Sequence, residues 1–202
     1  MLVQETINIL HNIWPMLVII VSILTSFRVA DVIINKKEFV FYKDVLLLGF
    51  IIYIMALFYA VTYQDVDWTT SNFVPFREIM RFGINDERFI RDIVGNTVMF
   101  IPYGFFVSYF LKLNKVKIVL ILSFATSLTI ELTQSIIGRV FDVDDLILNV
   151  LGGFLGYLLY RVIHRIKENL PKPLQNDWFI NIITFIAILI LIIYFLSHLV
   201  VI

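Results

Sequence analysis

Residues 116–149, VKIVLILSFATSLTIELTQSIIGRVFDVDDLILN, combine a helix-length apolar run, a short polar turn and the start of a second apolar run. A helix needs roughly 20 apolar residues to cross the hydrocarbon core of a bilayer. The first run, 116–137, meets that length although it contains Glu131 and Gln134. An ionisable side chain is costly at such a depth, so it needs a partner inside a helix bundle. The stretch predicts two membrane spans joined at a polar site.

The composition of the whole chain also indicates an integral membrane protein. Of its 202 residues 60% are hydrophobic, and the mean hydropathy is +0.91. The absence of cysteine excludes disulfides, thiolate metal sites and cysteine nucleophiles. A net charge of zero gives no reason to expect a nucleic-acid partner, and no cofactor is predicted. The first apolar run continues past Phe27 without a small-residue cleavage site, so we interpret it as a retained span.

Six apolar segments are long enough to cross a membrane as helices. The predicted fold class is therefore all-α, a polytopic membrane helix bundle of about six transmembrane helices. Pro171 and Pro173 separate the last two segments, and residues 64–92 form the one long connection. We interpret residues 1–202 as a single membrane domain. The predicted spans are 13–34, 45–63, 93–111, 116–137, 146–163 and 178–201.

The distribution of basic residues predicts the orientation of these spans, because cytoplasmic loops carry the excess of Lys and Arg. Eleven of the 16 basic residues fall on one side. The other five are Arg77, Arg81, Arg88, Arg91 and Arg139. Both termini, the long connection and the acidic turn at 138–145 are therefore predicted to face outward.

Ser127, Glu131 and Gln134 follow one another at helical spacing and share one face of the fourth span. We expect this face to point into the bundle, with Arg139 as the partner of Glu131. The carboxylate is then a candidate functional group. The alternative is that Glu131 is a paired or protonated packing residue, or that it reaches the outer surface.

Three carboxylates lie close together in the turn GRVFDVDD. Asp145 is predicted to cap the fifth span, because an Asp before an apolar helix accepts orphan amide hydrogen bonds. Asp142 and Asp144 could bind Ca²⁺ or Mg²⁺, although two carboxylates are short of a full ligand set. Within the fifth span, Gly152 and Gly156 form a small-xxx-small face that favours close helix packing. Asn149 is expected either at the polar site or in an interhelical hydrogen bond.

The third span, with the segment before it, carries further candidates. Pro102 interrupts the helical hydrogen bonding of an apolar stretch, so a kink is expected there. In the preceding segment, SNFVPFREIMRFG, apolar and charged residues would fall on different sides of a helix. This pattern is typical of a short helix that lies in the membrane surface. An ordinary loop helix packed on the bundle explains the same pattern.

These motifs, in this order and spacing, resemble the VanZ-like family across residues 45–163. They are Asn72 followed by VPF, NTVMFIPYG at 96–104, ELTQ at 131–134, RVFDVDD at 139–145 and NVLGGFLG at 149–156. The spans 13–34 and 178–201 lie outside the match. The resemblance implies a small multi-pass protein of the bacterial cytoplasmic membrane, in a family named for a member that gives low-level resistance to teicoplanin, a lipoglycopeptide. It implies no particular reaction.

Three functions remain open at this point. A binding protein would hold an amphiphile at its outer face, either a polyprenyl-phosphate-linked cell-wall precursor or a lipoglycopeptide, with arginines against the anionic group. A membrane enzyme would use Glu131, but the chain has no H-E-x-x-H or G-x-S-x-G motif. A transporter or flippase would use a buried carboxylate and a kinked helix. We favour the binding protein, which would contribute to teicoplanin-type resistance or envelope homeostasis. Its other expected partners are the lipids of the membrane.

The candidate ligand-binding residues follow from the polar positions and from the matched motifs. They are Asn72, Pro75, Phe76, Arg77, Asn96, Phe100, Pro102, Gly104, Glu131, Gln134, Arg139, Asp142, Asp144, Asp145, Asn149, Gly152 and Gly153.

Overall fold

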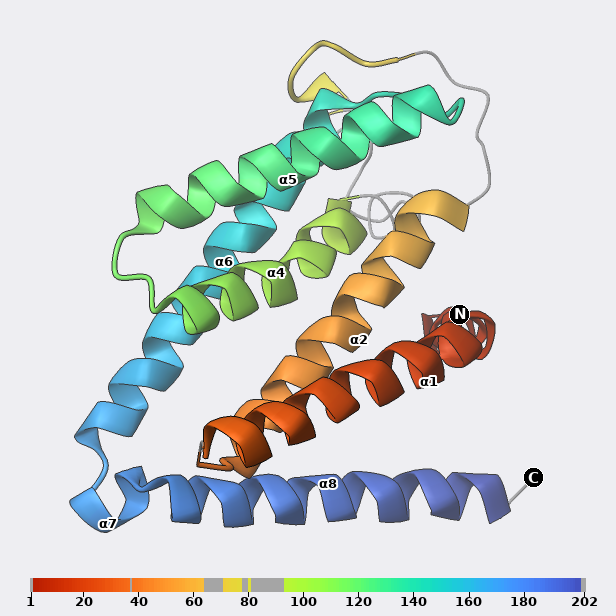
Figure 1. Cartoon of the computed structure of the whole chain (residues 1–202). Coiled ribbons are helices and arrows are strands. Elements are labelled where there is room, and N and C mark those ends of the chain that lie inside the picture. The colour runs from red at the N-terminus through yellow and green to blue at the C-terminus, as the bar shows by residue number, and fades with distance from the viewer. Residues whose placement is uncertain (1, 37, 64–70, 78–79, 81–92, 201–202) are drawn as a thin grey trace.

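Helices make up nearly all of the chain that the structure, a computed structural model, describes: residues 2–36, 38–63, 71–77, 80 and 93–200. Their bounds are α1 Leu2–Asn35, α2 Phe41–Tyr63, α4 Gly95–Leu111, α5 Val116–Ile136, α6 Val143–Asn169, α7 Lys172–Gln175 and α8 Asp177–Val200 (Figure 1). Within these residues there is no strand, only an isolated parallel bridge between Asn72 and Asp142. The predicted all-helical class is confirmed.

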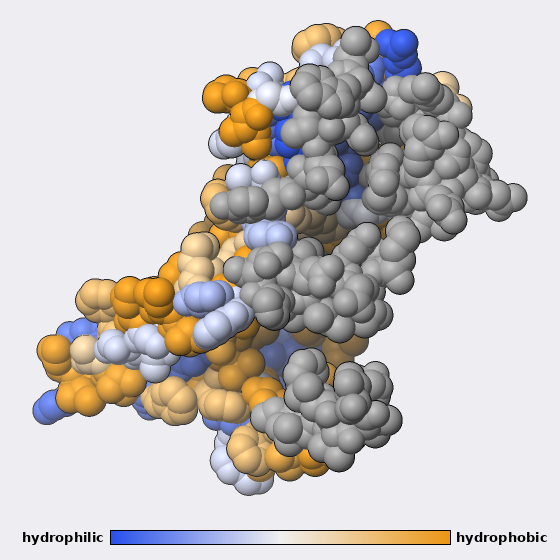
Figure 2. Space-filling view, turned by 90° about the vertical axis from the view of Figure 1, so that its right-hand side faces the viewer, coloured by the Kyte–Doolittle hydropathy of each residue, from blue (hydrophilic) through white to orange (hydrophobic). Residues whose placement is uncertain are grey.

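Each of the six predicted spans coincides with one of the long helices. Four stretches are long and apolar enough to cross a membrane, namely Ile13–Asn35, Phe41–Thr62, Val116–Ile136 and Val143–Asn169. The 17-residue α4 and the apolar segment Asp177–Leu191 of α8 are shorter. Hydrophobic residues cover much of the visible helix surface (Figure 2), as a protein surrounded by lipid requires.

The closest packing in the bundle joins α4 to α6, and glycines permit it. A Cβ atom on Gly156 would lie 2.1 Å from the carbonyl oxygen of Ile101, and one on Gly152 would lie 2.1 Å from that of Thr97. These backbone contacts leave no room for any side chain. The predicted packing role of the small-xxx-small face is therefore confirmed, and α5 completes a group of three helices with α4 and α6 (Figure 1).

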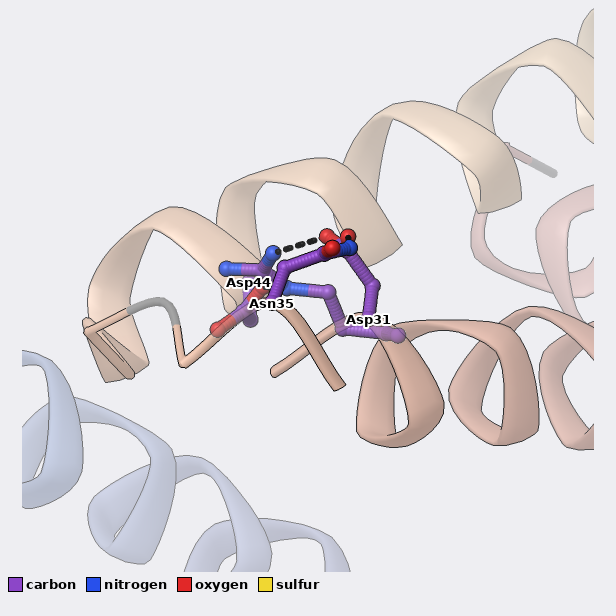
Figure 3. Close-up of polar contacts among 4 residues, drawn as sticks. Asp31, Asn35 and Asp44 are labelled. Atoms are coloured by element: carbon purple, nitrogen blue, oxygen red, sulfur yellow. Dashed lines mark hydrogen bonds and ion pairs between the residues drawn. The ribbon is translucent and has the colours of Figure 1, made fainter. Parts of the chain in front are cut away.

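Polar side chains fasten the turn between α1 and α2. Arg28 Nε donates to Asp44 Oδ1 at 2.7 Å, and its Nη1 lies 3.3 Å from Asp31 Oδ2. The side chain of Asn35 donates to Asp31 at 2.6 Å, which completes the cluster (Figure 3). Because each of these side chains has at least one polar partner, the helix ends can lie near the membrane surface without leaving an isolated charge.

Asp177 joins the start of α8 to the start of α2. Its carboxylate accepts hydrogen bonds from the Tyr42 hydroxyl and from Lys43 Nζ, each at 3.0 Å. One turn later, the side chain of Asn181 accepts from the Tyr42 backbone N–H at 2.9 Å. The helix that follows the Pro171–Pro173 break is thereby tied to the rest of the bundle.

The helix directions bring both ends of the chain to one side, because α1 begins and α8 ends on the same side of the molecule (Figure 1). Which side faces the cytoplasm remains the prediction made from the basic residues. We expect a cysteine at Ser71 to react with an impermeant thiol reagent applied to intact cells, and one at Lys115 to react only after permeabilisation. The parent chain has no cysteine and serves as the unlabelled control. The reverse labelling pattern would invert the orientation.

Candidate functional site

The polar site lies where α5 ends and α6 begins, and Asp142 organises it. Asp142 has extended backbone angles, is the N-cap of α6, and accepts a hydrogen bond from the Asp144 N–H at 2.8 Å. The prediction that Asp145 caps this helix is wrong. The helix begins three residues earlier than predicted, which places Asp145 in its first turn, where its carboxylate instead accepts from the Asn96 side chain of α4.

The segment before Arg77 is fastened to this helix start by a short parallel bridge. Asn72 N–H donates to the Phe141 carbonyl at 2.9 Å, and the Asn72 carbonyl accepts from Val143 N–H at 3.1 Å. The Asn72 side chain donates to Asp142 Oδ1 at 2.9 Å, and only 4% of this residue is exposed. Asn72 thus uses its backbone and its side chain together to hold a distant part of the chain.

Phe76 makes a second attachment to α6. Its N–H donates to the buried carboxylate of Asp144, and its backbone adopts a left-handed φ of 65°. Such a φ is uncommon for a bulky residue and needs surrounding contacts to maintain it. Of the predicted surface helix, residues 78, 79 and 81–83 lie outside the described residues. The described part is the bridge at Asn72, a turn at 75–76 and helical positions at Arg77 and Met80, with the Met80 N–H donating to the Phe76 carbonyl at 3.0 Å.

Glu131 is the buried carboxylate of this site. Ser123, Ser127 and Glu131 form the buried face of α5, and Glu131 is only 1% exposed, so the prediction that it points into the bundle is confirmed. Its Oε2 accepts from the Asp142 N–H at 3.0 Å. The same residue, Asp142, therefore caps α6 with its side chain and binds Glu131 with its backbone. Ser123 is a further polar residue of this face, and its four-residue spacing from Ser127 is the sequence signal that indicates it.

Gln134 lies between Glu131 and Arg139. With its amide nitrogen toward the carboxylate, it donates to Glu131 Oε1 at 3.2 Å, and its oxygen accepts from Arg139 Nη1 at 3.0 Å. Arg139 Nη1 also donates to the Val61 carbonyl of α2 at 2.6 Å. Among the described residues, Glu131 has no direct ion pair with Arg139, so the predicted pairing is replaced by a relay through an amide.

A turn at the end of α5 returns Arg139 toward Gln134. Gly138 has a φ of 87°, and Arg139 N–H donates to the Gln134 carbonyl at 2.9 Å while Gly138 N–H donates to that of Ser135. These are the two bonds of a Schellman motif, which uses glycine because the left-handed region disfavours other residues. The turn formed by residues 136–139 therefore fixes the backbone position from which the Arg139 side chain extends.

Other predicted site residues lie within the packing of α4 and α6, away from the acidic turn. Asn149 donates to the Ser127 hydroxyl at 2.9 Å, which supports the interhelical alternative. Phe100 is fully buried, and Pro102 lies within α4 without ending that helix. Gly104 and Gly153 meet backbone to backbone, since a Cβ on Gly104 would lie 2.0 Å from the Gly153 oxygen, and Gly152 packs on α4. The structure gives these glycines a packing role.

The surface of the site combines aromatic and cationic side chains. Phe73, Pro75, Phe76 and Arg77 are all exposed, and the Phe73 ring stacks on Phe141 with centroids 5.4 Å apart. The bridge at Asn72 and the bond at Asp144 hold this segment in place. A fixed, amphipathic edge therefore borders the partly buried network of Glu131, Gln134 and Arg139.

The carboxylates of the acidic turn are engaged by hydrogen bonds within the protein. Asp142 accepts from two donors and Asp144 accepts from Phe76 N–H. Within the described ranges, no group of three or more His, Cys, Asp or Glu residues is placed to hold a metal ion. The carboxylate oxygens of Asp142 and Asp144 thus serve as hydrogen-bond acceptors within the protein.

We expect Asp142→Ala to lower the free energy of unfolding by roughly 1–2 kcal/mol, because it removes both the helix cap and the acceptor for Asn72. Thermal unfolding in a fixed detergent measures this change. Asp142→Asn is the matched control, since asparagine caps a helix about as well as aspartate and keeps the acceptor oxygen for Asn72 and for the Asp144 N–H. An equal loss of stability in both variants would contradict the assignment of the cap to Asp142.

Comparisons with known proteins place the chain in a family. The VanZ/LLP1 family profile matches residues 44–164, which include the Asn72 bridge, α4, α5 and most of α6. Protein VanZ of Enterococcus faecium is 34% identical over 107 residues, which cover 50% of this chain and 60% of that relative. The chain thus matches about three fifths of the relative's length. No solved structure matches the chain. Because the profile matches more than half of the chain, this membrane protein belongs to the VanZ/LLP1 family.

Proposed function

We propose that this VanZ/LLP1 membrane protein binds an amphiphile at the end of the bundle where α5 meets α6. One observation carries the proposal: residues 72–77 present exposed Phe73, Phe76 and Arg77 on a segment that is fastened to Asp142 and Asp144. Aromatic rings suit an acyl or polyprenyl chain, whereas a guanidinium suits a phosphate or carboxylate. The fixed segment would present both groups to one ligand without first having to be ordered.

The two arginines of this site have different roles in the proposal. Arg139 is half-buried and is committed to the Val61 carbonyl and to Gln134, so it orders the site. Arg77 is exposed beside Phe76 and would contact the anionic group of the ligand. Glu131 would accept from the Gln134 amide nitrogen and so keep the amide oxygen turned toward the Arg139 guanidinium.

The biological setting comes from the family. Its name-giving member provides low-level resistance to teicoplanin, which is an amphiphile because it carries an acyl chain. We propose that this chain contributes to teicoplanin-type resistance or to envelope homeostasis in the bacterial cytoplasmic membrane, by binding either the lipoglycopeptide or a polyprenyl-phosphate-linked precursor. Both ligands combine an apolar chain with anionic groups.

A binding measurement tests the proposal. Purified protein in lipid nanodiscs would be titrated with teicoplanin and, separately, with a polyprenyl phosphate, using Phe73→Ala/Arg77→Gln as the variant. We expect its affinity to fall roughly tenfold or more, because a charged hydrogen bond and an aromatic contact are lost. Phe39→Ala/Lys117→Gln changes the same residue classes at exposed positions away from the site.

Two outcomes would overturn the proposal. Equal binding by the variant, its control and the parent would show that residues 72–77 do not contact the ligand. Release of phosphate from a polyprenyl diphosphate, abolished by Glu131→Gln, would instead establish the membrane enzyme.

A parallel measurement in cells compares the inhibitory concentration of teicoplanin with that of a glycopeptide lacking the acyl chain. If the protein binds an amphiphile, its expression should protect against teicoplanin and not against the second compound.

A further inference from the structure

A second polar surface lies on α6 at the end opposite Asp142. It is a groove of about 280 Å³ lined by Leu158, Arg161, Val162, His164, Arg165 and Glu168. Positions 158, 161, 165 and 168 recur at helical spacing, so the groove runs along one face of the helix. Neither this groove nor its residues belong to the site at Glu131.

The length of α6 places this groove at the membrane surface. The helix has 27 residues and is therefore about 40 Å long, whereas the hydrocarbon core of a bilayer is about 30 Å thick. If Val143 lies at one interface, Arg161 and Arg165 lie about 27 and 33 Å along the axis, at the opposite interface. Leu158 and Val162 are exposed and would face acyl chains.

The groove has an excess of positive charge, and three of its exposed side chains contact other groups. Arg161 Nη1 donates to the side chain of Asn114 at 3.2 Å, which holds the guanidinium against the α4–α5 turn. His164 stacks on Tyr160, and its Nε2 lies 3.3 Å from the carboxylate of Glu168. Since Glu168 faces this imidazole, the two arginines provide the cationic part of the groove.

We propose that this groove binds the headgroup of an anionic phospholipid, with Arg161 and Arg165 on its phosphate and Leu158 and Val162 along its acyl chains. Guanidinium forks match phosphate oxygens, and basic pockets at the ends of membrane helices favour anionic lipids. The exposed apolar residues distinguish a lipid from a free anion, since a free anion gains nothing from them. The site is independent of the amphiphile site at the other end of the bundle.

Native mass spectrometry of the full chain tests this, after reconstitution with equal amounts of phosphatidylglycerol and phosphatidylcholine. We expect the parent to retain phosphatidylglycerol and Arg161→Gln/Arg165→Gln to bind it roughly 25-fold more weakly, since each cation near a membrane surface contributes about a factor of five. Lys117→Gln/Lys172→Gln is the matched control, because it removes the same charge from exposed positions that do not line the groove.

The competing outcomes are distinct. An equal loss in the control would show that the preference comes from general charge attraction and would overturn the proposed site. Displacement of the lipid by millimolar inorganic phosphate would show that the groove takes a free anion, which also overturns it. Size-exclusion profiles of both variants establish that they are folded. Loss of the outer amphiphile site in Phe73→Ala/Arg77→Gln would leave this measurement unchanged.

Discussion

Gly156→Ala is expected to destabilise the bundle by roughly 2–3 kcal/mol, although alanine is the better helix former. In an open helix this change gains up to about 1 kcal/mol of helix propensity. At Gly156, however, the new Cβ would lie 2.1 Å from the Ile101 oxygen and 2.6 Å from the Phe105 nitrogen. Both atoms are backbone, so α4 and α6 must separate and lose their packing along the whole contact.

Thermal unfolding in detergent, followed by the loss of the monodisperse species in size-exclusion chromatography, measures this effect. Gly49→Ala is the matched control, because the nearest atom to its Cβ would be the tip of the Phe106 ring at 3.8 Å, an ordinary contact. Gly49→Ala should leave the unfolding temperature unchanged or raise it. Equal stability of the two variants would refute the close α4–α6 contact.

Under the proposed function, Glu131→Gln is expected to abolish protection against teicoplanin while leaving the protein at normal abundance in the membrane. The carboxylate accepts two hydrogen bonds, from Asp142 N–H and from the Gln134 amide. A glutamine at 131 has a single acceptor oxygen, so its own NH₂ would face that of Gln134. If Gln134 turns over to accept from it, its nitrogen then faces the Arg139 guanidinium, and two donors meet.

The substitution therefore breaks the relay without creating a cavity, and the lower cost of burying a neutral side chain offsets the unpaired donor. The measurement is the inhibitory concentration of teicoplanin in a susceptible bacterium that expresses each variant, with membrane abundance determined by immunoblot. Glu38→Gln makes the same chemical change at an exposed position between α1 and α2 and should behave like the parent. Full protection by Glu131→Gln would leave the carboxylate as a packing residue.

The apolar pattern of the sequence predicted the helical class and the approximate place of the six long helices in the described part of the chain. It succeeded because a span in lipid must satisfy its backbone hydrogen bonds within the helix, so length and hydropathy nearly suffice. The inward face of Glu131 followed from helical spacing. So did the packing role of Gly152 and Gly156, because small residues four apart present a flat strip to a neighbouring helix.

The hydrogen-bonding partners within the polar site were decided by tertiary structure alone. Asp145 and Asp142 are both good caps in sequence, and the choice of Asp142 depends on the bridge to Asn72, which lies 70 residues away. Similarly, Arg139 is placed between Gln134 and the Val61 carbonyl by the turn at Gly138 and by the position of α2. Helical spacing determines which side chains share a face, whereas partners on different helices depend on how those helices cross and where each one ends.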